Sequence, residues 1–83
     1  MSTQNELLTR LEEKYPKLSK GQKRLTDYIR QNYDKAAFMT ASKLGEAVGV
    51  SESTVVRFAS QLGYKGYPEF QKALEELVRN KLN

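Results

Sequence analysis

Leucines recur at helical spacing in the first stretch of the chain. Leu7, Leu8 and Leu11 gather on one side of a helical projection, with charged and polar residues around them. We predict a helix over residues 4–14, because the Tyr-Pro pair that follows disfavours continuation: Pro16 pushes the residue before it out of the helical region.

The second amphipathic stretch opens with a strong start signal. Ser19 is followed three residues later by Gln22, the spacing of a capping box in which each side chain bonds the backbone N–H of the other. Leu25 and Ile29 then mark one face, and we predict a helix over residues 19–33. Residues 34–39 are predicted to be a single helical turn or a connector, with Ala36, Ala37 and Phe38 packed inward.

Two short helical runs follow with almost nothing between them. The first covers residues 40–48 and the second covers residues 51–62, so only two residues join them. Ser51 is a favoured N-cap for the second run. Gly63 supplies the left-handed residue that commonly ends a helix.

The last run begins near a proline, which suits the first turn of a helix. It starts at Pro68, and no stretch of the chain alternates with the period of two that a strand requires. The predicted fold is all-α, a single domain over residues 1–83 made of five helices without a sheet. The inward residues expected on the last helix are Phe70, Ala73, Leu74, Leu77 and Val78.

The two short runs have the residue pattern of a helix-turn-helix, in which a second helix projects from a support helix at about 90–120°. Close crossing requires a small residue on the support helix, which Gly45 provides, and the turn requires a residue that tolerates positive φ, which Gly49 provides. Apolar side chains from both helices would fill the angle between them: Leu44, Val48, Val50, Val55 and Phe58.

The second helix of this motif divides into two faces by its 100° step per residue. Opposite the buried stripe, Arg57 can form two hydrogen bonds with guanine, and Val56 can touch a thymine methyl group, as in major-groove readers. Taken alone, Ser53 and Ser60 fit an ordinary solvated surface better. The candidate base-reading residues are Ser53, Thr54, Val56, Arg57, Ser60 and Gln61.

Charge is distributed unevenly along the chain. The formal net charge is +4, but residues 14–43 carry eight basic and two acidic side chains, a net +6, while residues 1–13 carry −2 and residues 44–83 balance at zero. A basic segment suits a phosphate backbone, and a lysine-rich helix face in water remains an equal alternative. The candidate phosphate contacts are Lys20, Lys23, Arg24, Lys43, Ser51 and Lys65.

The composition removes most catalytic chemistry. The chain has no cysteine and no histidine, and therefore lacks thiol nucleophiles, the commonest general base and the commonest metal ligands. The acidic pairs at 12–13 and 75–76 are adjacent on helices and point about 100° apart, which is unsuitable for a shared metal. We expect no enzyme activity, metal or cofactor, and the absence of a signal peptide or membrane span predicts a cytoplasmic protein.

Two blocks carry a family resemblance. Residues 54–58 read TVVRF and residues 62–67 read LGYKGY, and with the two glycines of the predicted motif they resemble the amino-terminal DNA-binding domain of RpiR-type bacterial transcription regulators. The similarity extends from about Leu7 to Leu77. Pro68 departs from the serine that is usual in that family, but a proline at a helix start also fixes φ.

The resemblance implies a sequence-specific reader of double-stranded DNA for sugar or phosphosugar metabolism genes, acting as a repressor or activator. It implies a homodimer on a palindromic operator, and a phosphosugar effector bound only by a carboxy-terminal sugar-isomerase-like domain beyond Asn83. The partner surface is expected at Leu7, Leu8 and Leu11 with part of the last helix, although these leucines fit an internal core equally well. The alternative function is an all-helical protein-interaction or dimerisation module without base readout.

Overall fold

The computed structural model describes residues 6–82. The all-α prediction is confirmed, since these residues form helices and connectors without a strand. Gln4, the predicted start of the first helix, lies outside the described residues. The elements are α1 (Glu6–Lys14), the 3-10 turn η1 (Tyr15–Lys17), α2 (Lys20–Ala36), α3 (Ala41–Val48), α4 (Glu52–Gln61) and α5 (Tyr67–Leu82).

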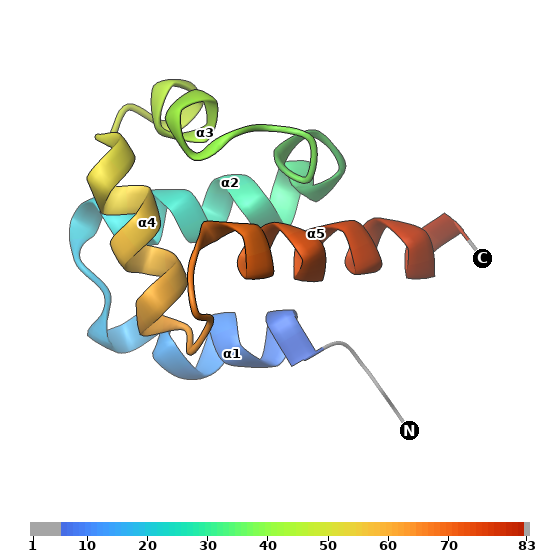
Figure 1. Ribbon diagram of the computed structural model, residues 1–83. Coiled ribbons are helices and arrows are strands. Elements are labelled where there is room, and N and C mark those ends of the chain that lie inside the picture. The colour runs from blue at the N-terminus through green and yellow to red at the C-terminus, as the bar shows by residue number, and fades with distance from the viewer. Residues whose placement is uncertain (1–5, 83) are drawn as a thin grey trace.

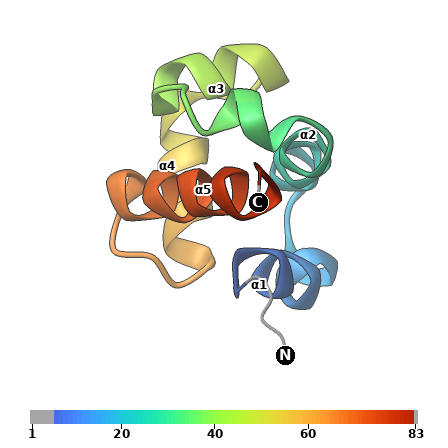
Figure 2. The same ribbon diagram turned by 90° about the vertical axis from the view of Figure 1, so that its right-hand side faces the viewer.

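Two long helices form the centre of the molecule. α2 and α5 pack against each other, with α3 on one side of the pair and α1 on the other (Figures 1 and 2). The shorter α4 runs steeply across the amino-terminal ends of both long helices (Figure 1). One side of α4 therefore packs on the rest of the protein, while the opposite side faces outward.

One apolar core joins all five helices. Leu25 and Ile29 of α2 meet Phe58 of α4 and Leu74 of α5, and all four are fully buried. Each such side chain stabilises the fold by about 1.5–3 kcal/mol relative to exposure. Phe70 is the centre of an aromatic cluster whose ring centroids lie 5.9 Å from Phe58, 5.8 Å from Tyr64 and 5.7 Å from Tyr67.

The predicted cap of the second helix is present. The Ser19 N–H donates to Gln22 Oε1 at 3.2 Å, and the Gln22 N–H donates to Ser19 Oγ at 3.3 Å. Thr40 caps α3 with a single bond, because its Oγ1 accepts from the Lys43 N–H at 3.1 Å. These caps fix where the helices begin, and so they set the angles at which the helices leave their connectors.

The prediction for the end of α2 is confirmed in part. The helix continues to Ala36 after a kink at Asn32, where φ is −138° and ψ is 41°. The inward packing of Ala36 and Ala37 is confirmed, but the prediction for Phe38 is wrong, because its side chain is 76% exposed. A turn of successive backbone bonds, Phe38 N–H to Lys35 O and Met39 N–H to Ala36 O, carries Phe38 away from the core.

The first helix ends where the sequence predicts. α1 stops at Lys14, and Pro16 lies in the 3-10 turn that follows. The alternatives for the leucines of this helix are resolved in part: Leu7 and Leu11 are buried in the core, whereas Leu8 is 37% exposed. Only Leu8 of the three therefore remains available to a partner.

Candidate nucleic-acid interface

The crossing of α3 and α4 depends on a glycine, as predicted. A Cβ atom on Gly45 would lie 2.6 Å from the carbonyl oxygen of Val50 and 3.3 Å from that of Ser51, which is closer than side chains tolerate. The Gly45 carbonyl also accepts the N–H of Gly49 at 2.7 Å and that of Val50 at 2.9 Å. The turn between the two helices is therefore built directly against the backbone of α3.

The turn itself has the predicted left-handed residue. Gly49 has φ 92° and ψ 32°, a conformation that costs other residues about 1–2 kcal/mol. The apolar residues expected to fill the angle between α3 and α4 divide into two groups: Leu44, Val55 and Phe58 are fully buried, and Val48 and Val50 are half-buried. This arrangement gives the predicted helix-turn-helix.

The amino-terminal end of α4 is also tied to α2. Arg24 Nη2 donates to the carbonyl oxygen of Gly49 at 3.3 Å. Gly21 lies beneath the same turn, since a Cβ atom there would be 3.1 Å from Val50 Cγ1. The start of α2 and the start of α4 are therefore neighbours, and a ligand bound at one is close to the other.

The outward face of α4 holds the predicted base-reading residues. Ser53, Val56, Arg57, Ser60 and Gln61 are exposed, with 40% of Val56 accessible. A shallow hollow on this face is lined by Glu52, Ser53, Val56 and Arg57. The residues of α4 therefore divide into a buried apolar face and an exposed polar face, as its helical periodicity predicts.

Three hydroxyl groups meet at the first turn of α4. Ser51 Oγ accepts from the Thr54 N–H at 3.2 Å and forms hydrogen bonds with Ser53 Oγ at 3.1 Å and Thr54 Oγ1 at 2.9 Å. Thr54 is half-buried, so its hydroxyl belongs chiefly to the cap. Of the predicted base-reading residues near this end, Ser53, Val56 and Arg57 are exposed.

The predicted phosphate contacts do not form one continuous patch. Lys20 and Arg24 lie at the start of α2 beside the turn before α4, whereas Lys65 lies in the connector after α4. Lys43 is exposed on α3 with its ammonium group 3.9 Å from Glu46. The Lys23 ammonium group lies 5.4 Å from the centre of the Tyr15 ring.

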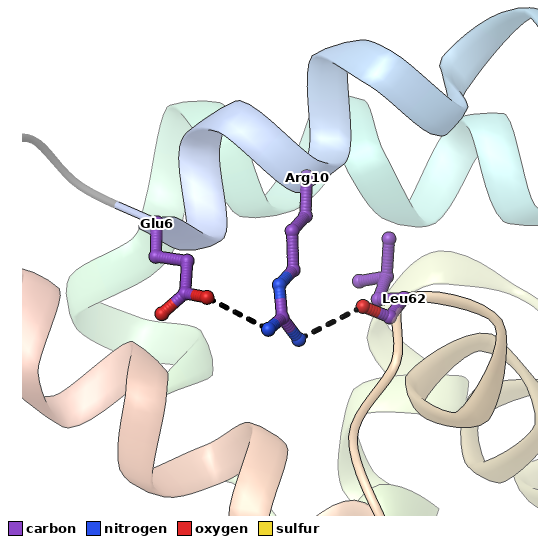
Figure 3. Close-up of polar contacts among 3 residues, drawn as sticks. All are labelled: Glu6, Arg10 and Leu62. Atoms are coloured by element: carbon purple, nitrogen blue, oxygen red, sulfur yellow. Dashed lines mark hydrogen bonds and ion pairs between the residues drawn. The ribbon is translucent and has the colours of Figure 1, made fainter.

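One residue at this site was not predicted from the sequence. Arg10 of α1 donates from Nη1 to the carbonyl oxygen of Leu62 at 3.0 Å, at the carboxyl end of α4 (Figure 3). The two residues are 52 positions apart in the sequence, so no local sequence pattern predicts the contact. Arg10 thus holds the carboxyl end of α4, and Arg24 bonds the turn that precedes its amino-terminal end.

Two other kinds of site receive no support from the described part of the chain. Among residues 6–82, no three acidic side chains come together as metal ligands do. No helix in that range is both long and apolar enough to traverse a bilayer.

Comparison with known proteins places this geometry among transcription regulators. YfhH of Escherichia coli K12, an uncharacterized HTH-type transcriptional regulator, is 39% identical over 71 residues, covering 86% of this chain and 25% of YfhH. HexR of Pseudomonas aeruginosa, also an HTH-type transcriptional regulator, is 33% identical over 70 residues, covering 84% of this chain and 25% of HexR. The chain therefore spans about a quarter of the length of these curated relatives.

A solved structure has the same fold. NanR of Vibrio vulnificus, determined in complex with ManNAc-6P, superimposes with a TM-score of 0.82 at 36% identity, covering 92% of this chain and 29% of that one. Residues 5–81 match the family described as the helix-turn-helix domain of the rpiR family. The chain belongs to the rpiR family of helix-turn-helix domains.

Proposed function

We propose that this chain is the sequence-specific DNA reader of a transcription regulator, with α4 lying in the major groove of duplex DNA. The observation that carries the proposal is the position of Arg57, exposed on the outer face of a helix whose inner face is fully buried. An α-helix fits the major groove of B-DNA, and an arginine there can read guanine through O6 and N7.

The side chains around Arg57 complete the proposed reading face. Ser53 and Ser60 supply short hydroxyl groups that either donate or accept, and Val56 supplies an apolar contact for a thymine methyl group. Gln61, the last residue of α4, can bind adenine through two hydrogen bonds where the major groove reaches the carboxyl end of this helix. Thr54 contributes to the reading face through its hydroxyl group, which is hydrogen-bonded to that of Ser51.

Phosphate contacts would fix the position of α4 without reading sequence. Lys20 and Arg24 are suited to a phosphate beside the amino-terminal end of α4, where Ser51 caps the helix and the helix dipole favours negative charge. Lys65 suits a phosphate at the other end. Lys43 and Lys23 suit more distant phosphates on either side.

The assembly and regulation of the full-length protein are part of this proposal. A homodimer on a palindromic operator would place two copies of α4 about 34–36 Å apart in successive major grooves. The likeness to NanR, which was solved with ManNAc-6P, supports regulation of sugar or phosphosugar metabolism genes, and we place the regulator in the cytoplasm. Its phosphosugar effector would bind a separate domain, since HexR and NanR are roughly three times as long as this chain.

Selection of bound duplexes from a random pool tests the proposal, with the single chain and a tethered dimer run in parallel. The proposal predicts enrichment of one half-site, present twice with two-fold symmetry in the dimer pool. The logarithm of affinity should fall linearly with the logarithm of salt concentration, with a slope of about −0.9 for each phosphate neutralised. An unenriched pool from both proteins at low salt would contradict it and favour the protein-interaction alternative.

A further inference from the structure

The guanidinium group of Arg10 forms bonds to two different elements. Its Nη1 donates to the Leu62 carbonyl oxygen at 3.0 Å, and its Nη2 donates to Glu6 Oε2 at 2.7 Å in the same helix (Figure 3). Figure 3 shows the side chain of Arg10 extending from α1 between Glu6 and the end of α4. The ion pair with Glu6 therefore holds the guanidinium group in the orientation that reaches Leu62.

The same group fills the space beside the two residues that follow Leu62. Gly63 has φ 97°, and a Cβ atom on it would lie only 3.1 Å from Arg10 Nη1. The guanidinium carbon lies 4.6 Å from the centre of the Tyr64 ring, within the range of a cation–π interaction. Arg10 thus contacts three consecutive residues at the point where α4 passes into the connector before α5.

The end of α4 is otherwise completed by its own backbone. The N–H of Gly63 donates to Ser60 O at 2.9 Å and the N–H of Tyr64 donates to Ala59 O at 3.1 Å. The carbonyl oxygen of Leu62, the C-cap of α4, accepts a bond from Arg10, and a cation at a helix carboxyl end also complements the helix dipole.

α1 provides a rigid base for this contact. Leu7 and Leu11 flank Arg10 in the sequence and are both buried in the core, so the backbone of α1 at Arg10 is fixed by packing. A bond from such a base to the end of α4 restricts the tilt of α4. Arg24 makes the corresponding bond at the opposite end, to the Gly49 carbonyl.

We infer that Arg10 is a positioning residue for DNA reading, which sets the tilt of α4 in the groove by holding its carboxyl end against α1. This inference rests on the proposed function of α4. Both terminal nitrogens of its guanidinium group make hydrogen bonds within the protein, so we assign Arg10 a role through α4.

The matched pair Arg10→Met and Arg79→Met tests the inference. Both remove one positive charge and keep an unbranched stem, and Arg79 is exposed on the carboxy-terminal half of α5, which points away from α4 (Figure 1). The affinity ratio between the selected operator and a random duplex should fall roughly tenfold for Arg10→Met, the effect of one lost charge-assisted hydrogen bond. It should stay unchanged for Arg79→Met, and the two variants should share one salt slope.

Two results would overturn the inference. An unchanged operator ratio for folded Arg10→Met would reduce Arg10 to a stabilising residue. An equal loss on both duplexes with a salt slope smaller by about 0.9 would make it a direct phosphate contact. If Arg10→Met does not fold, Arg10→Lys replaces it in the test. The affinity ratio between operator and random duplex should fall for this variant too, because a lysine lacks the planar guanidinium group that bonds Glu6 and Leu62 at the same time. Absence of any operator preference in the unmodified protein would instead contradict the proposed function.

Discussion

The carbonyl oxygen of Val50 lies 2.6 Å from the position that a Cβ atom on Gly45 would take, so any larger residue at position 45 would clash with it. The backbone of α3 thus touches the backbone of the turn that leads into α4, and no side chain can move aside to make room. The angle between α3 and α4, and with it the direction of Arg57, follows from this contact.

Gly45→Ala should therefore lower the free energy of unfolding by about 1–3 kcal/mol, the usual cost of overpacking. Operator binding should weaken even where the variant is folded, because α4 must move away from α3. Thermal unfolding and operator titration at a temperature below the transition measure the two effects. Gly66→Ala is the control, because its added Cβ would meet only Pro68 Cδ at 3.7 Å; an equal loss in both variants would contradict this account.

Gly49 should respond to substitution through its backbone alone. No atom lies within 4 Å of a Cβ built there, but its φ of 92° disfavours L residues. Gly49→Ala should cost about 1 kcal/mol, and Gly49→Asn less, because asparagine tolerates the left-handed region better. Denaturant unfolding of both variants checks the order. A larger loss for asparagine than for alanine would mean that side-chain contacts, not backbone strain, govern this turn.

Arg57 and Lys20 should affect binding in different ways. Arg57→Ala should cost about 1–3 kcal/mol on the selected operator and relax the preference at one base pair. Lys20→Ala, beside the turn before α4, should weaken operator and random duplexes alike and reduce the salt slope by about 0.9. Titrations of both duplexes at several salt concentrations separate the two. Equal losses on both duplexes for Arg57→Ala would remove its assignment as a base reader.

Tyr67 should make stability depend on alkaline pH. Its hydroxyl donates to the Met39 carbonyl oxygen at 2.7 Å, and burial raises its pKa from 10.0 to about 12. The unfolded chain releases this proton near pH 10 and the folded chain near pH 12, so the free energy of unfolding is intact below pH 10 and falls between the two values. Denaturant unfolding from pH 8 to 11.5 measures the decline.

Tyr67→Phe is the control for that decline. The variant should lose about 0.5–1.5 kcal/mol at neutral pH, because the Met39 carbonyl still accepts from Gln71 Nε2 at 3.0 Å. Its stability should fall less steeply than that of the unmodified protein above pH 10. Parallel curves for the two proteins would assign the alkaline loss to other groups.

Local signals account for most of the fold that the sequence predicts. The pairing of Ser19 with Gln22 is a contact between near neighbours, and so is the cap that Ser51 provides. The need for Gly45 and Gly49 also follows from the shortness of the connection between two helices, since few backbone paths join them. The division of α4 into inner and outer faces follows from its periodicity.

The contacts that the sequence did not predict are the distant ones. Arg10 bonds Leu62 across 52 positions, and the acceptor is a backbone carbonyl oxygen. Every residue type has this atom, so the identity of residue 62 gives no sign of the contact. Phe38 was expected inside because large apolar residues usually are, yet the backbone turn after α2 leaves it exposed while Ala36 and Ala37 are buried. Asn32, where α2 kinks, has no proline or glycine beside it to mark the bend.

Amide chemical-shift mapping during titration with the selected operator tests whether α4 enters the groove, because it reports on each residue of the unmodified protein. We expect the largest changes in α4 from Ser53 to Gln61 and in the turn before it, with smaller changes at the start of α2. Changes confined to α5 and the connector around Phe38, with the amides of α4 unmoved, would contradict this expectation.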